Sequence, residues 1–217
     1  MKRPLTVMLC VCLAVLAAPA SRAAEKAAPV TAGKAAPPAV ASTAPDSVQL
    51  LEKTVAKDST RFDNLYKLGV MYLDKDRVND AVTVLTKAHV LKPKDHRVMV
   101  NLGAALDAAG RAGEAQGYYK EALTVAPDDS VASCRLASSL YAQSRYPDAV
   151  DILRGVIKTA PRAYCAYFTL GVAFADAGIY KDAIRMWRKV VELAPTSPEA
   201  VSARESIDVL EKFTQQQ

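Results

Sequence analysis

The sequence predicts an all-α solenoid in which antiparallel pairs of helices stack one on the next. Three kinds of residue recur with a step of 34 positions over four copies: a Leu that precedes a small residue, an Ala, and a Pro. A period of 34 residues is typical of arrays built from helix–turn–helix units. The recurring residues are Leu68, Leu102, Leu136 and Leu170; Ala81, Ala115, Ala149 and Ala183; and Pro93, Pro127, Pro161 and Pro195.

Residues 1–23 have the pattern of a secretory signal peptide. Lys2 and Arg3 precede an apolar run over residues 5–18, and small residues follow at the spacing of a cleavage site. The run is shorter than the roughly 20 residues that a helix needs to cross a bilayer. We therefore expect an exported, periplasmic protein. The alternative is that the segment is retained as an inner-membrane anchor.

The next 21 residues, 24–44, consist mostly of Ala and Pro and contain no aromatic residue. Such a segment cannot bury enough apolar surface to offset the entropy of ordering, which predicts a disordered linker. Residues 45–61 contain a predicted helix from about 47 to 56, with Val48, Leu51 and Val55 on one face. Because it has the pattern of the second half of a repeat, we interpret it as an N-terminal cap or a degenerate copy.

Four full copies follow, and we expect two helices in each. The predicted helices lie at 62–74 and 78–91 in copy 62–95, at 96–109 and 112–125 in copy 96–129, at 130–142 and 145–159 in copy 130–163, and at 164–176 and 179–193 in copy 164–197. The last segment, 198–217, begins a helix at Pro198 with Ser197 as its N-cap. Its charged outer face is typical of the capping helix of a repeat array.

These copies resemble tetratricopeptide repeats over residues 62–197. In the second copy, the residues of the family pattern are Leu102, Gly103, Leu106, Ala115, Tyr119, Ala122 and Pro127; in the fourth, they are Leu170, Gly171, Phe174, Ala183, Trp187, Val190 and Pro195. The third copy departs most, with Ala137 in place of Gly. The resemblance implies a right-handed superhelical solenoid, TPR-like, in which small residues let paired helices approach and large ones such as Trp187 fill the core.

Charge and motif content argue against several classes of function. Of the formal net charge of +5, residues 1–44 carry +4, so the repeats are nearly neutral and lack the clustered cations of a nucleic-acid surface. His89 and His96 do not have the spacing of a metal-binding pair on one helical face. We find no Gly-rich phosphate loop and no Gly-x-Ser-x-Gly motif. We therefore expect no enzymatic activity, no cofactor, no metal and no nucleic-acid partner.

Two cysteines, Cys134 and Cys165, lie in the predicted first helices of adjacent copies, 31 positions apart. An oxidising compartment would permit a disulfide between them. Axes of neighbouring helices are usually about 8–10 Å apart, whereas bonded Cα atoms lie within about 7 Å, so the bond requires a favourable tilt. The alternative is two small, buried apolar side chains.

The family resemblance also implies that the first helices line a concave groove that binds a protein partner. The candidate residues are mostly aliphatic or aromatic, which suits an extended or helical apolar peptide of an envelope complex. Alternatively, the valines among them only pack between adjacent first helices. Two other functions are also open for the whole protein: self-assembly through stacked repeats, or a role as a membrane-anchored accessory subunit of an envelope or secretion complex. The candidates are Tyr66, Val70, Leu73, Arg97, Val100, Asn101, Ala104, Asp107, Val131, Cys134, Arg135, Ser138, Tyr141, Cys165, Phe168 and Val172.

Overall fold

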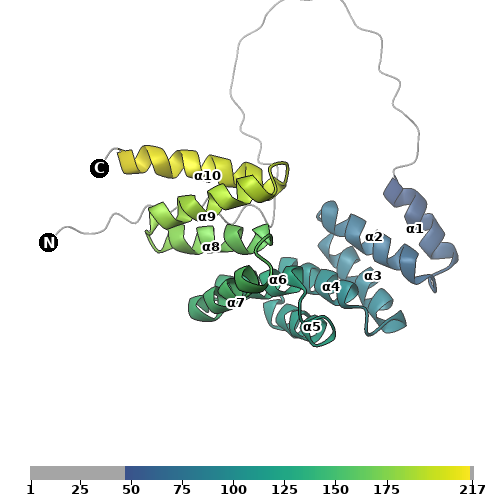
Figure 1. The fold of residues 1–217 in the computed structure, drawn as a ribbon. Helices are drawn as coiled ribbons and strands as arrows, with labels where there is room; N and C mark the ends of the chain where they lie inside the picture. The colour runs from purple at the N-terminus through teal and green to yellow at the C-terminus, as the bar shows by residue number, and fades with distance from the viewer. Residues whose placement is uncertain (1–46, 216–217) are drawn as a thin grey trace, which may run out of the picture.

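The computed structural model describes residues 47–215, in which α-helices connected by short turns are the only regular elements (Figure 1). The predicted signal peptide and linker of residues 1–44 lie outside the described residues. The helices are α1 (Ser47–Lys57), α2 (Phe62–Asp74), α3 (Val78–Leu91), α4 (His96–Ala108), α5 (Ala112–Val125), α6 (Ser130–Ala142), α7 (Tyr146–Thr159), α8 (Tyr164–Asp176), α9 (Tyr180–Leu193) and α10 (Pro198–Gln215).

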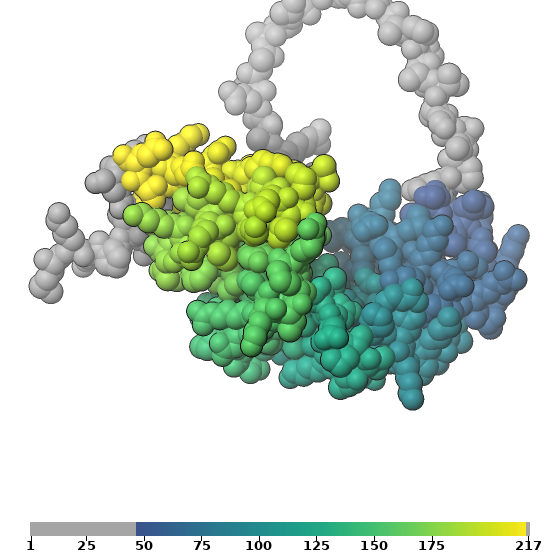
Figure 2. All heavy atoms as spheres, in the orientation of Figure 1, coloured from purple at the N-terminus to yellow at the C-terminus, as the bar shows by residue number. Residues whose placement is uncertain are grey.

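The helices stack in pairs along a curved array, with α1 at one end and α10 at the other (Figure 1). Helices α2, α4, α6 and α8 are the first helices of the four repeats, and α3, α5, α7 and α9 are the second ones. The space-filling view shows an indentation between the N-terminal repeat and the C-terminal helices (Figure 2). The predicted all-α solenoid is therefore confirmed, and none of the described helices is long and apolar enough to cross a membrane.

The turn inside each repeat has the same backbone conformation at the same position. Asp76, Gly110, Ser144 and Gly178 follow the 34-residue step, and all four have positive φ, from 57° to 76°. This left-handed region favours glycine because an L side chain clashes there. Two of the four turns therefore carry a residue that is less suited to its conformation than glycine.

The recurrent small residues of the first helices lie against large side chains of the second helices. A Cβ atom added to Gly103 would lie 2.5 Å from Cε1 of Tyr119, and one added to Gly171 would overlap the indole of Trp187. Both aromatic side chains are fully buried, as the sequence predicts. The first repeat has a leucine in place of the aromatic residue, and a Cβ added to Gly69 would lie 2.5 Å from Cγ of Leu85. In the third repeat Ala137 and Leu153 occupy the equivalent positions, and both are fully buried.

The core of the array divides within α8. One cluster of buried side chains runs from α1 to the residues Ala166 and Leu170 of α8. A second cluster begins at Ala175, near the end of α8, and continues through α9 and α10. Helix α8 contacts both clusters along its length: Tyr164 and Phe168 near its start also pack against the second cluster, and Phe174 near its end packs against both.

Candidate functional site

The predicted groove residues all lie on α2, α4, α6 and α8, but their exposure differs. Arg97, Val131 and Arg135 are exposed, whereas Val100 and Cys134 are buried and can contribute only to the floor. The others are half-buried: Tyr66, Val70, Leu73, Asn101, Ala104, Asp107, Ser138, Tyr141, Cys165, Phe168 and Val172.

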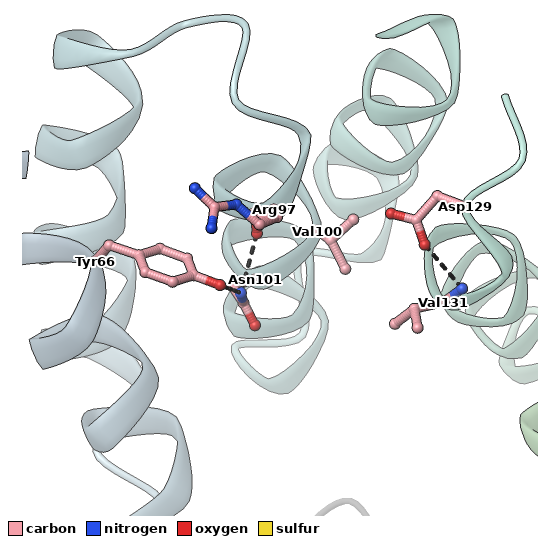
Figure 3. Close-up of a pocket in the computed structure, with 6 residues that line it drawn as sticks. All are labelled: Tyr66, Arg97, Val100, Asn101, Asp129 and Val131. Carbon is pink, nitrogen blue, oxygen red and sulfur yellow. Dashed lines mark hydrogen bonds between the residues drawn. The ribbon is translucent and has the colours of Figure 1, made fainter. Parts of the chain in front are cut away.

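A pocket of about 220 Å³ lies where the starts of α4 and α6 face α2 (Figure 3). Asn101 is at its centre: its amide nitrogen donates hydrogen bonds to the Tyr66 hydroxyl and to the Arg97 carbonyl oxygen, both at 3.0 Å. These bonds fix the side chains of two adjacent repeats relative to each other. The lining residues are Tyr66, Arg97, Val100, Asn101, Asp129 and Val131.

Valine side chains form the apolar part of this pocket. Val131 is the second residue of α6, and its side chain is 54% exposed. Val100, which also lines the pocket, is buried. Asp129, which sequence reasoning did not include in the site, accepts hydrogen bonds from the backbone N–H groups of Val131 and Ala132. It also contacts Nδ1 of His96 at 3.0 Å, so its carboxylate is already engaged.

The cations near the pocket differ in what they contact. Arg97 forms an ion pair with Asp95 at 2.7 Å, and its guanidinium lies 5.4 Å from the centre of the Tyr66 ring, within cation–π range. Arg135 and Lys67 are both exposed, and neither has an ion-pair partner among residues 47–215. Lys67 was missed as a candidate, although it has the same place in its repeat as Asn101 and Arg135.

Asp107 is held inside the array rather than presented to a partner. Its carboxylate accepts hydrogen bonds from the hydroxyls of Tyr119 and Ser139, each at 2.9 Å, and Ser139 in turn accepts one from Gln116. Burial raises the pKa of Asp107 above its ordinary value and raises that of Tyr119 as well. This network joins the second and third repeats, which makes Asp107 a structural residue.

The groove side of α6 contacts α8 along its length. A disulfide joins Cys134 and Cys165, whose Cα atoms are 6.1 Å apart. The hydroxyls of Ser138 and Thr169 lie 3.3 Å apart, and the hydroxyl of Tyr141 donates a hydrogen bond to Asp176. Beyond these contacts, Phe168 and Val172 pack against the C-terminal cluster and leave part of their surface open.

Within the part of the chain that the structure describes, no group of three or more His, Cys, Asp or Glu residues could hold a metal ion. The arrangement of the groove is suited to binding: an apolar pocket lies between an exposed valine and a hydrogen-bonded Tyr–Asn pair. Such pockets, with a few convergent polar groups, are typical of recognition sites.

Comparison with known proteins identifies the repeats. Residues 66–130 and 134–198, together more than half of the chain, match the family model described as Tetratricopeptide repeat. No curated protein matches the chain.

Several solved structures share the fold. MamA from Desulfovibrio magneticus RS-1 is 19% identical over 70% of this chain and 85% of its own, with a TM-score of 0.56. TTC0263, a thermophilic TPR protein in Thermus thermophilus, is 18% identical; the match covers 74% of this chain and 88% of TTC0263, with a TM-score of 0.63. YrrB, described as a TPR protein with an unusual peptide-binding site, is 20% identical; the match covers 73% of this chain and 81% of YrrB, with a TM-score of 0.53.

Proposed function

Since the chain belongs to the tetratricopeptide repeat family, we propose that it is a noncatalytic scaffold that binds an extended segment of a partner protein. The binding surface is the groove formed by α2, α4, α6 and α8, and its centre is the pocket between Tyr66 and Val131. The observation that carries the proposal is this pocket, in which an exposed valine stands beside polar groups that retain hydrogen-bonding capacity. The likeness to YrrB, which has a peptide-binding site, is consistent with it.

The polar groups of the pocket favour an extended segment over a helix. The Tyr66 hydroxyl accepts a hydrogen bond from Asn101 and still has its own hydrogen to donate. The side-chain oxygen of Asn101 has no hydrogen-bond partner among the described residues. This adjacent donor and acceptor match the C=O and N–H of an extended backbone, whereas a helix uses these groups internally.

The remaining surface specifies side chains of the partner. An aliphatic or aromatic side chain fits against Val131 and the Tyr66 ring, because Asp129 and Arg97 already have charged or hydrogen-bonding partners. Lys67 and Arg135 lie on the two helices that flank α4, and each is an exposed cation. We therefore expect an apolar anchor residue with acidic residues on both sides of it.

Export to the cell envelope is part of the same proposal. It is supported by the basic start and apolar run of residues 1–23, and by the disulfide, since such bonds persist in oxidising compartments. The partner is then a protein of the envelope. N-terminal sequencing of the protein from a cell-envelope fraction tests this: a mature chain that begins near residue 24 supports export, and an intact chain in the cytoplasm contradicts it.

The binding proposal is tested with a charge in the pocket. A random-peptide display library selected on the full chain supplies a fluorescent peptide, and its Kd is then measured by anisotropy. Val131→Asp should weaken binding at least tenfold, because it places a carboxylate where the apolar anchor lies. The fold should persist, since an acidic residue in the first turn of α6 is favourable to the helix dipole.

Val201→Asp is the matched control. Val201 is 50% exposed, close to the 54% of Val131. It is the fourth residue of α10, which is not one of the groove helices. Its Kd should stay within twofold of the wild-type value. Equal Kd values for wild type and Val131→Asp, with unchanged circular dichroism, would show that the pocket is not the binding site.

A further inference from the structure

Three contacts join α6 to α8 on the groove side, and we call them the α6–α8 seam. They are the disulfide between Cys134 and Cys165, the Ser138–Thr169 hydroxyl pair and the hydrogen bond from Tyr141 to Asp176. The disulfide lies nearer the start of both helices, and the Tyr141–Asp176 bond lies at their ends. The seam therefore contains one covalent contact at one end and two hydrogen bonds farther along.

The seam lies at α8, where the two main clusters of buried side chains meet. Ala166 and Leu170 of α8 belong to the cluster of the preceding repeats, and the cluster of α9 and α10 begins at Ala175. A tilt of α8–α10 against the third repeat would shift Ala166, Leu170 and Met186 within the first cluster and leave the contacts inside the second cluster in place. The seam opposes such a tilt on the side that faces the groove.

We propose that the Cys134–Cys165 disulfide is a redox-sensitive clasp that sets the angle of α8–α10 to the preceding repeats. Its consequence for binding rests on the function proposed above: the angle fixes where Phe168 and Val172 stand relative to the pocket between Tyr66 and Val131. The oxidised array presents one groove shape, and the reduced array presents another.

Reduction by a dithiol gives a balanced route between the two states. Cys134 is 4% exposed and Cys165 is half-buried, so the incoming thiolate attacks Sγ of Cys165. The bond between the two sulfurs breaks, and Sγ of Cys134 leaves as a thiolate that takes up a proton. The second thiol of the reagent then displaces Cys165 from the mixed disulfide, which leaves two cysteine thiols and one oxidised dithiol.

The size of the change follows from the geometry of the seam. Two sulfur atoms that are not bonded lie about 1.5–2 Å farther apart than two that are bonded. Cys134 and Tyr141 are separated by roughly 10 Å along α6, so opening at one end tilts α8 by about 10°. Near the end of α10, Phe213 packs against Tyr180, close to the pivot at Asp176, so the start of α10 is the part that moves most. It lies about one length of α8 from the pivot, roughly 20 Å, and should move by about 3–4 Å.

Peptide mapping without reductant tests the bond itself. Trypsin cuts after Lys120, Arg135, Arg162 and Lys181, so a disulfide produces a linked species of residues 121–135 and 163–181. The linked species should be present in protein from the cell envelope and disappear on reduction. Two separate peptides in the unreduced sample would overturn the proposal.

The tilt is tested by a distance between spin labels on α1 and α10, measured by double electron–electron resonance. Noncanonical residues at the exposed positions Lys53 and Val201 carry the labels, which leaves the cysteines unmodified. Dithiothreitol should change the mean distance by about 3–4 Å. A Cys134→Ser/Cys165→Ser variant should show the reduced distance with or without dithiothreitol, which controls for any effect of the reagent elsewhere. Distances that agree within about 1 Å in all samples would overturn the clasp.

The two proposals fail in different ways. If the distance changes and the Kd of the selected peptide changes at least threefold, the clasp regulates the groove. A distance change without a change in Kd overturns the regulatory part alone. If no groove-dependent peptide is found, the proposed function fails, and the distance measurement still decides whether the clasp exists.

Discussion

The close contact between Gly103 and Tyr119 predicts that an added methyl group destabilises the array. In the variant Gly103→Ala the new Cβ would lie 2.5 Å from Cε1 and 2.9 Å from Cδ1 of the ring. The ring cannot move aside easily, because it is fully buried and its hydroxyl is bonded to Asp107. Overpacking costs about 1–3 kcal/mol, against about 0.5–1 kcal/mol gained by replacing a helical glycine with alanine.

We therefore expect Gly103→Ala to lower the free energy of unfolding by about 1–2 kcal/mol, measured from urea midpoints by circular dichroism. Gly117→Ala is the control: Gly117 lies exposed inside α5 with nothing within 4 Å of an added Cβ, so it should stabilise by about 0.5–1 kcal/mol. If Gly103→Ala is as stable as Gly117→Ala, the glycine does not serve close packing.

A second variant distinguishes a steric clash from an effect on the helix alone. Gly103→Ala/Tyr119→Leu recreates the Ala137–Leu153 pair of the third repeat. The two substitutions should be coupled, so that the double variant is more stable than the sum of the single effects by at least about 1 kcal/mol. Strict additivity would refute the packing argument.

Three further predictions concern the turns and the networks between repeats. Ser144→Gly should raise the free energy of unfolding by about 0.5–1 kcal/mol in urea titrations, because φ at this position is 62°. Asp129→Ala should lower it by about 1–2 kcal/mol, as α6 loses its N-cap and His96 loses its partner. Because burial raises the pKa of Asp107, the folded chain binds this proton more tightly than the unfolded chain does. The free energy of unfolding of wild type, relative to Asp107→Asn, should therefore be greatest at pH values below 3.8, the ordinary pKa of Asp, and should fall as pH rises through the folded-state pKa. Urea titrations of both proteins across this pH range measure the difference.

The helices could be predicted closely because their signals are local and repeated. Each predicted boundary within residues 47–198 agrees with the structure to within one residue. The 34-residue step places a small residue, a large residue and a terminal proline in the same phase in each copy, so one repeat supports the interpretation of the others. Ser197, expected as an N-cap, accepts a hydrogen bond from the backbone N–H of Ala200.

The candidate groove was less predictable, because position along a helix does not determine what a side chain contacts. Val100 and Val131 both point to the groove side, yet one is buried and the other is 54% exposed. Asp107 has a groove position, but Tyr119 and Ser139 occupy its oxygens. These outcomes depend on contacts between repeats, which a pattern within one repeat cannot show.

The 34-residue period does not determine which residues of adjacent first helices contact each other. Cys134 and Cys165 are 31 positions apart, whereas Tyr66 and Asn101, which are hydrogen-bonded, are 35 apart. Neither separation equals 34, because adjacent first helices contact each other through side chains that face across the gap rather than through equivalent positions. A separation of 31 thus moves the contact by about one helical turn, which brings the Cα atoms of the two cysteines to 6.1 Å. The hydroxyls of Ser138 and Thr169 are also 31 positions apart, so the same offset recurs one turn farther along α6 and α8.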